Sequence, residues 1–191
     1  MTHLILIRHS ISNPQADQSA HQWQLTAEGQ ARCIHLADAI RHYQPTRFYS
    51  SDEPKALDTA KGVMQALNIP PDGLQADVKF RETARATAPF FDRHEDFQQA
   101  IHQAMLNPDD LCFGEETFSD ALKRFSRGID ELIQAHPTEN VAIVSHGTIL
   151  SLYIAHQTGR AVFPLWRSLD MPAYAVFSLP AGEPIALKER I

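Results

Sequence analysis

This 191-residue sequence has few of the features that indicate a metal site, a membrane span or a nucleic-acid-binding surface. It has two cysteines, Cys33 and Cys112, and no Cys-x-x-Cys or Cys/His spacing links them. A zinc site therefore has no support, and we expect two reduced thiols. No apolar run approaches the length that crosses a bilayer, so we expect no membrane partner. Lysine and arginine total 17 against 23 acidic residues, a net charge of -6 that argues against a nucleic-acid partner.

The amino-terminal sequence enters a strand-like run at once. A basic segment followed by a long apolar segment is not present there, so we predict no signal peptide and a cytoplasmic location. The chain is 43% hydrophobic and 21% charged, which is ordinary for a globular protein. Its length suits one domain with a substantial core, and we predict a single domain over residues 1–191.

Strand-like and helix-like segments alternate along the chain, which predicts an α/β layered fold. Thr26 and Thr117 are predicted N-caps, and the segment 51–54 is predicted to begin another helix. Two further helices are expected near 95–105 and over 148–157. The predicted strands are 3–8, 47–50, 74–80, 141–145, 173–179 and 185–187. The segment 84–114 lacks a regular pattern and is predicted to be a small insertion.

Two apolar runs far apart in the sequence each end in a histidine. His9 follows the run 4–7 and Arg8, and His146 follows the run 141–144 and a serine. Ligands bind at the carboxyl edge of the strands in open α/β sheets, so both histidines are candidates for one pocket with Arg8 as an anion ligand. A hydrogen-bonded residue at a strand end remains the alternative for each histidine taken alone.

A third strand end leads into a helix at residues 50–60. Such a junction offers free backbone amides and the positive end of a helix dipole to an anion. Lys55 lies in the first turn of this helix. Taken alone, this lysine could equally lie in solvent on an exposed helix face.

Taken together, these segments resemble the histidine phosphatase superfamily, branch 1, also called phosphoglycerate-mutase-like. The family pattern consists of Arg-His-Gly, Leu-Thr-x-x-Gly, Ser-Ser-Pro-x-x-Arg-Ala-x-x-Thr-Ala, a central glutamate and a late His-Gly. The matching segments are Arg8-His9-Ser10, Leu25-Thr26-Ala27-Glu28-Gly29, Ser50 to Ala60, Arg81-Glu82 and Ser145-His146-Gly147. The resemblance spans nearly the whole chain. It implies a three-layer α/β/α sandwich with a mostly parallel central sheet.

The resemblance also implies roles for individual residues. His9 would be the nucleophile that forms a phosphohistidine, and Glu82 would protonate the leaving group and then activate water. His146 would stabilise the charge on the transferring group, and Arg8 would bind its oxygens. No metal or other cofactor is expected, because the cationic side chains supply the charge. The expected partner is a small phosphorylated substrate, with phosphate or sulfate able to occupy the pocket.

The chain departs from the family pattern at several positions. Ser10 replaces the glycine after the nucleophile, and Lys55 replaces the second phosphate-binding arginine, which loses the two-pronged guanidinium geometry. Arg85 is a candidate to compensate as a phosphate ligand, whereas Arg81, also considered, is expected to be a surface charge. Ser12 matches a frequent serine or threonine of the family and is a further phosphate-binding candidate. Near the start of the helix at Thr117, Glu115 or Glu116 could serve as a second acid.

We therefore predict a metal-independent phosphohydrolase that acts on a phosphomonoester through His9. The small insertion favours hydrolysis over mutase activity. Two alternatives stay open: a regulatory protein that binds a phosphorylated ligand with weakened catalysis, which Lys55 motivates, and a phosphohistidine-protein phosphatase. The sequence predicts neither the substrate nor the oligomeric state.

Overall fold

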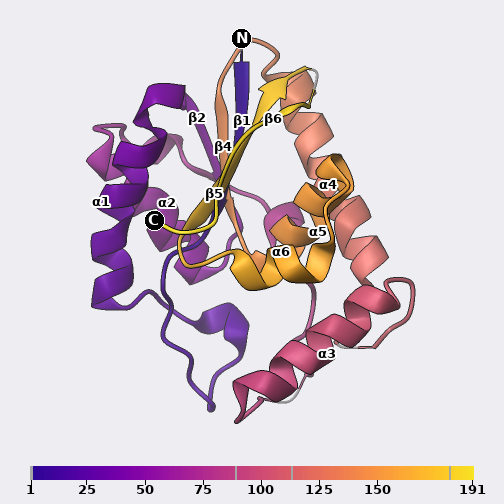
Figure 1. The fold of residues 1–191 in the computed structure, drawn as a ribbon. Coiled ribbons are helices and arrows are strands. Elements are labelled where there is room, and N and C mark those ends of the chain that lie inside the picture. The colour runs from indigo at the N-terminus through magenta and orange to yellow at the C-terminus, as the bar shows by residue number, and fades with distance from the viewer. Residues whose placement is uncertain (1, 89, 113, 181) are drawn as a thin grey trace.

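The computed structural model of the chain describes residues 2–88, 90–112, 114–180 and 182–191. The described residues form a six-stranded sheet in the order β3-β2-β4-β1-β5-β6, which is seen nearly edge-on in Figure 1. In chain order its strands are β1 (Thr2–Arg8), β2 (Arg47–Ser50), β3 (Gln75–Ala76), β4 (Val141–Ser145), β5 (Ala173–Leu179) and β6 (Pro184–Lys188). The pairs β1–β4, β2–β4 and β2–β3 are parallel, and β5 is antiparallel to both β1 and β6.

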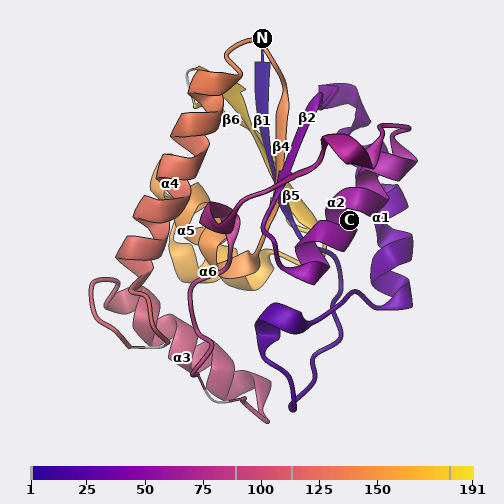
Figure 2. The same ribbon diagram turned by 180° about the vertical axis from the view of Figure 1, so that it is seen from behind.

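Helices cover both faces of this sheet, as Figures 1 and 2 show. On one face lie α1 (Ala27–Ile40) and α2 (Pro54–Ala66); on the other lie α4 (Phe118–Ala135), α5 (Gly147–Thr158) and α6 (Val162–Ser168). The helix α3 (His94–Leu106) lies below the amino-terminal end of α4 in Figure 1. Short 3-10 turns are η1 (Ala20–Gln22), η2 (Arg41–Tyr43), η3 (Pro71–Gly73) and η4 (Val78–Phe80). The predicted three-layer α/β/α sandwich with a mostly parallel sheet is thereby confirmed.

The sheet divides the hydrophobic core into two clusters. Alternate residues of β1 point to opposite faces, so Leu4 and Leu6 pack with α4 and α5, whereas Ile5 and Ile7 pack with α1 and α2. All four side chains are almost fully buried. This burial on both faces explains why the sequence of β1 is an uninterrupted apolar run. The central strands are therefore fixed on both sides, and so are the residues at their carboxyl ends.

The predicted helix caps are present. The hydroxyl oxygen of Thr26 accepts a hydrogen bond from the amide of Gly29, and that of Thr117 accepts one from the amide of Asp120. Each satisfies an amide that the first turn of a helix leaves without a partner. At the start of α2, Glu53 occupies the N-cap position and Pro54 the first helical position, with no side-chain cap. The Glu53 side chain is consequently available for other contacts.

Two expectations about secondary structure were wrong. The predicted strand 74–80 contains only the two-residue β3, because the chain then turns through η4, whose start is capped by the Asp77 side chain accepting from the amide of Lys79. The helix α6 was not predicted, because it has only seven residues and contains Pro164. The predicted insertion 84–114 includes α3, but Pro89 and Phe113 in this segment lie outside the described residues.

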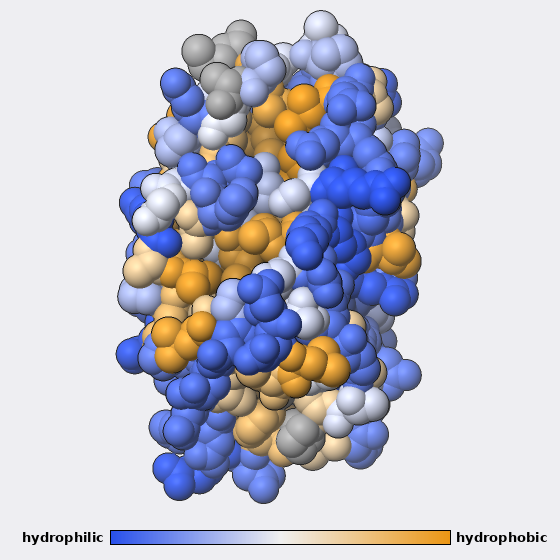
Figure 3. Space-filling model, turned by 90° about the vertical axis from the view of Figure 1, so that its right-hand side faces the viewer, coloured by the Kyte–Doolittle hydropathy of each residue, from blue (hydrophilic) through white to orange (hydrophobic). Residues whose placement is uncertain are grey.

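No helix in the part of the chain that the structure describes is both long enough and apolar enough to cross a membrane. The face that carries α4, α5 and α6 is drawn by hydropathy in Figure 3. Hydrophobic side chains appear there as patches separated by hydrophilic ones. Hydrophobic patches of this kind are common on protein surfaces and do not by themselves identify an interface.

Candidate active site at the carboxyl ends of the central strands

His9 follows β1 directly and is held by two backbone carbonyl groups, those of Ser145 and Ser10. Its amide donates to the carbonyl oxygen of Ser145 at 2.9 Å, and its ring Nδ1 lies 2.7 Å from the carbonyl oxygen of Ser10. A carbonyl only accepts, so Nδ1 carries the hydrogen and Nε2 of the neutral ring keeps its lone pair. Burial first, and then the charges of Lys55 and Arg8, lower the pKa of His9 to about 3. The ring is therefore neutral near pH 7.

Arg8 lies beside His9 at the end of the same strand. Its Nη1 donates to the carbonyl oxygen of Leu169, and its buried Nε has no hydrogen-bond partner among the described residues. Burial lowers the pKa of Arg8, while the charges of Glu82 and Asp170 oppose that effect. A guanidinium with an unused N–H group is suited to binding an anion.

His146 follows β4 and occupies the N-cap position of α5. Its ring centroid lies 5.1 Å from that of His9, so the two histidines meet as the sequence predicted. The residue is 1% exposed, and neither of its ring nitrogens has a hydrogen-bond partner in the described part of the chain. Burial lowers the pKa of His146 well below its ordinary value, and the charge of Glu53 opposes this.

Lys55 is buried in the first turn of α2, which excludes the solvent-exposed alternative. Its Nζ donates to the carbonyl oxygen of Ala20 and to Oε2 of Glu53, both at 2.5 Å. The same nitrogen lies 6.0 Å from the ring centroid of Trp23. Burial lowers the pKa of Lys55, and its contact with Glu53 acts in the opposite direction.

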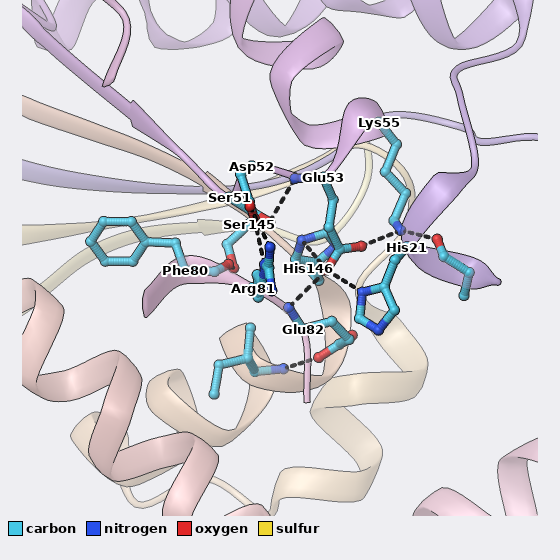
Figure 4. Close-up of polar contacts among 12 residues, drawn as sticks. His21, Ser51, Asp52, Glu53, Lys55, Phe80, Arg81, Glu82, Ser145 and His146 are labelled. Atoms are coloured by element: carbon cyan, nitrogen blue, oxygen red, sulfur yellow. Dashed lines mark hydrogen bonds and ion pairs between the residues drawn. The ribbon is translucent and has the colours of Figure 1, made fainter. Parts of the chain in front are cut away.

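A cluster is formed by the side chains of Arg8, His9, Lys55 and His146. It contains a further residue, Glu53, that the sequence did not identify. Figure 4 shows its carboxylate next to Lys55, His21 and His146. Its Oε1 lies 3.2 Å from Nδ1 of His21 and 3.4 Å from Nε2 of His146. Burial alone would raise the pKa of Glu53, but the contacts with His146, His21 and Lys55 outweigh burial and lower it. The available signal was an acidic residue two positions before Lys55 at a helix start.

Glu82 reaches the start of α5 from the segment after η4. Its two carboxylate oxygens accept from the amides of Thr148 and Ile149, each at 3.0 Å, and Oε1 also accepts from the amide of Thr83. The amide of Glu82 in turn donates to Oε1 of Glu53 at 3.3 Å, a contact drawn in Figure 4. The two buried carboxylates are therefore linked.

The remaining candidates occupy different surroundings. Arg85 is half-buried with its Cζ 5.1 Å from the ring centroid of Phe97, and its charge lowers the pKa values of Arg8, Lys55 and His146. This charge therefore acts on the cluster. Ser12 is buried, and its backbone forms an isolated bridge with Leu25.

Ser10 and Arg81 also have defined surroundings. The Ser10 amide donates to Oγ1 of Thr59 at 3.0 Å, and its buried hydroxyl has no partner among the described residues. Arg81 pairs with Asp52 near the surface, as expected of a surface charge.

A cavity of about 540 Å³ adjoins this cluster on the side of Glu53 and Glu82. Glu115 and Glu116 belong to its wall: Glu115 accepts from the amides of Ala86 and Thr87, and Glu116 pairs with Arg124. The rest of its lining is His21, Asp52, Val78, Arg81, Ala84 and Ala86. In the ranges that the structure describes, no group of three or more His, Cys, Asp or Glu side chains could hold a metal ion.

Solved structures of other proteins share the fold. The YhfR protein of Bacillus stearothermophilus superimposes with a TM-score of 0.77 at 21% identity, covering 100% of this chain and 98% of the other. A phosphoserine phosphatase mutant from Entamoeba histolytica, in complex with phosphoserine, gives a TM-score of 0.72 at 19% identity over 98% of this chain and 97% of its own.

Sequence comparison identifies a relative and a family. The chain is 22% identical to a metal-independent phosphoserine phosphatase of Arabidopsis thaliana over 157 residues, which are 78% of this chain and 66% of that protein. The model of the histidine phosphatase superfamily (branch 1) matches residues 4–183. Together with the matching fold, this match over nearly the whole chain shows that the chain belongs to the histidine phosphatase superfamily, branch 1.

Proposed function

We propose that this protein is a phosphohydrolase that acts on a small phosphomonoester through a phosphohistidine at His9. The observation that carries the proposal is the His9 ring. Its Nδ1 is fixed on the Ser10 carbonyl, so Nε2 presents a lone pair beside Arg8, Lys55 and His146. A neutral imidazole in a cationic pocket has the properties of a nucleophile toward a phosphoryl group. The names of the phosphatase relatives support the same reaction class.

In the first step, the Nε2 lone pair of His9 attacks phosphorus and the P–O bond to the leaving group breaks. The leaving oxygen keeps that electron pair and takes a proton from the Glu82 carboxyl. Arg8, Lys55 and Arg85 bind the phosphoryl oxygens, with Ser12 as a further ligand, and His146 donates to the charge that develops. In this proposal the side chains supply the positive charge, and the step uses no metal or other cofactor.

In the second step, water attacks the phosphohistidine. The Glu82 carboxylate accepts a proton from this water, the P–N bond breaks, and its electron pair returns to Nε2. The products are inorganic phosphate and the starting enzyme. We place the leaving group in the 540 Å³ cavity, because Glu82 lines that cavity and also belongs to the cluster around His9.

The test is a phosphomonoester panel with a chelator present, with phosphoserine first because two relatives carry its name. A ³²P-labelled substrate should label the wild-type protein on an acid-labile, alkali-stable histidine, and His9→Ala should not be labelled. Hydrolysis of no member of the panel together with no label would exclude the proposal. Hydrolysis that disappears on addition of chelator would exclude only its metal-independent form.

A second candidate is a regulatory protein that binds a phosphorylated ligand and has weak catalysis. The contact between Glu53 and Lys55 favours it, since this carboxylate reduces the positive charge available to an anion. Micromolar binding of phosphoesters without turnover, measured on the same panel, would select this candidate.

A further inference from the structure

Glu53 places a negative charge inside a cluster that is otherwise built to attract anions. Its side chain is 3% exposed and lies against Lys55, His21 and His146. Burying a carboxylate costs several kcal/mol unless it is paired. Here the pairing partners include two of the groups proposed to hold the phosphoryl oxygens.

The geometry makes the carboxylate a bridge between these two groups. One oxygen lies 2.5 Å from Nζ of Lys55, and the other lies 3.4 Å from Nε2 of His146. The 3.4 Å contact leaves His146 without a good hydrogen bond, and both of its buried ring nitrogens remain unused among the described residues. Glu53 thus holds Lys55 by an ion pair. His146 also faces Glu53, but it forms no hydrogen bond with it.

We propose that Glu53 sets the affinity of the phosphoryl site, as an internal anion that competes with phosphate for Lys55 and His146. This inference rests on the proposed function of the site. A phosphoryl group reaches these donors only by sharing them with Glu53 or displacing it. Glu53 therefore lowers the affinity for every phosphoryl anion, including the inorganic phosphate that hydrolysis would release. It also holds Lys55 in place while the site is empty.

The charges around Glu53 agree with this role. Asp52 is next to it in sequence but is paired with Arg81, and Glu82 contacts it through its backbone amide while its own oxygens accept from the start of α5. Glu53 is thus the carboxylate that directly contacts both Lys55 and His146. Lys55, which departs from the family pattern, thus contacts a buried carboxylate two positions before it.

The test is binding of inorganic phosphate, and separately of orthovanadate, by calorimetry at pH 7.5. Glu53→Gln keeps the shape and an acceptor for Lys55 but removes the charge. We expect phosphate to bind this variant about tenfold more tightly, the scale of one unit charge removed at short range in a partly screened site. Glu53→Asp keeps the charge and should stay within about threefold of wild type. Asp58→Asn removes a charge from the same helix α2 and should have no effect.

Unchanged or weaker phosphate binding by folded Glu53→Gln would overturn the inference, and so would equal gains from Glu53→Gln and Asp58→Asn. If Glu53→Gln does not fold, the wild-type protein supplies the measurement. The ¹³C resonance of the Glu53 carboxyl should shift with phosphate and saturate at the calorimetric Kd. A resonance that does not move at saturating phosphate would contradict the competition.

These outcomes are distinct from failure of the proposed function. A wild-type protein that binds neither phosphate nor vanadate and forms no phosphohistidine refutes the function and the inference together. A wild-type protein that binds and hydrolyses, with Glu53→Gln unchanged in phosphate affinity, refutes the role of Glu53 alone.

Discussion

Gly147 lies directly against the guanidinium group of Arg8. A Cβ atom at position 147 would be 2.9 Å from both Cζ and Nε of Arg8. A side chain at position 147 would therefore have to displace the Arg8 guanidinium. Arg8 is the last residue of β1 and Gly147 is the first residue of α5, so this contact joins the two motifs that contain His9 and His146.

We expect Gly147→Ala to displace the Arg8 guanidinium and to weaken phosphate binding at least tenfold. The added methyl leaves the backbone of α5 undisturbed, and alanine is the better helix former by about 1 kcal/mol, so the protein should stay folded. Calorimetry with phosphate and a thermal melt measure the two effects. Gly73→Ala is the matched control, because among the described residues no atom beyond its chain neighbours lies within 4 Å of its Cβ position. Equal phosphate affinity in both variants would contradict the displacement.

The pair of Glu53 and Lys55 should show strong non-additivity in stability. Lys55→Met leaves the carboxylate buried without its closest partner, a change that typically costs about 3–5 kcal/mol. Glu53→Gln in the same chain removes that orphaned charge, so the double variant should be more stable than Lys55→Met. Chemical denaturation of the four proteins gives the coupling free energy. A double variant whose losses simply add would show that the two side chains do not interact.

The lowered pKa of His9 predicts that the protein loses stability as it is acidified below about pH 6.5. The unfolded chain binds a proton near the ordinary histidine pKa of about 6.5, whereas folded His9 binds it only near 3. Between these values the unfolded state holds more protons, so the free energy of unfolding falls as the pH falls. Each such group contributes up to about 1.4 kcal/mol per pH unit. His146, with its pKa also lowered, contributes in the same direction.

His9→Asn should reduce this slope between pH 6.5 and pH 5.5, a window that lies above the range in which the lowered pKa of Glu53 matters. Urea denaturation at several pH values supplies the measurement. His35→Asn is the control, because that histidine is exposed on α1 and has solvent around it in both states. The same slope in wild type and His9→Asn would contradict a neutral, buried His9.

The sequence was most informative where burial and local hydrogen bonds decide the structure. The apolar runs of β1 and β4 predicted two buried strands, and with them the meeting of His9 and His146. The caps at Thr26 and Thr117 followed from local chemistry alone. The contacts of Glu53 could not be predicted from local sequence. Its partners His21 and His146 lie 32 and 93 positions away from it in the chain. Only the folded chain shows that Lys55 has a carboxylate partner.

Glu82 should contribute to stability independently of any catalytic role. Its two oxygens accept from three backbone amides, two of which lie in the first turn of α5, where helix amides otherwise lack partners. Glu82→Gln replaces one acceptor oxygen with an NH₂ group that faces a backbone N–H. We expect the free energy of unfolding to fall by about 2 kcal/mol, the usual loss for a buried hydrogen bond to a charged group.

Denaturation of Glu82→Gln without substrate measures this effect apart from hydrolysis. Glu115→Gln is the matched control: its carboxylate also accepts from two backbone amides, those of Ala86 and Thr87, but on an exposed loop where water can replace them. It should cost less than about 0.5 kcal/mol. Equal losses in the two variants would mean that the amides of α5 do not depend on Glu82. A Glu82→Gln protein as stable as wild type but without hydrolysis would confine Glu82 to chemistry and contradict the stabilising contact.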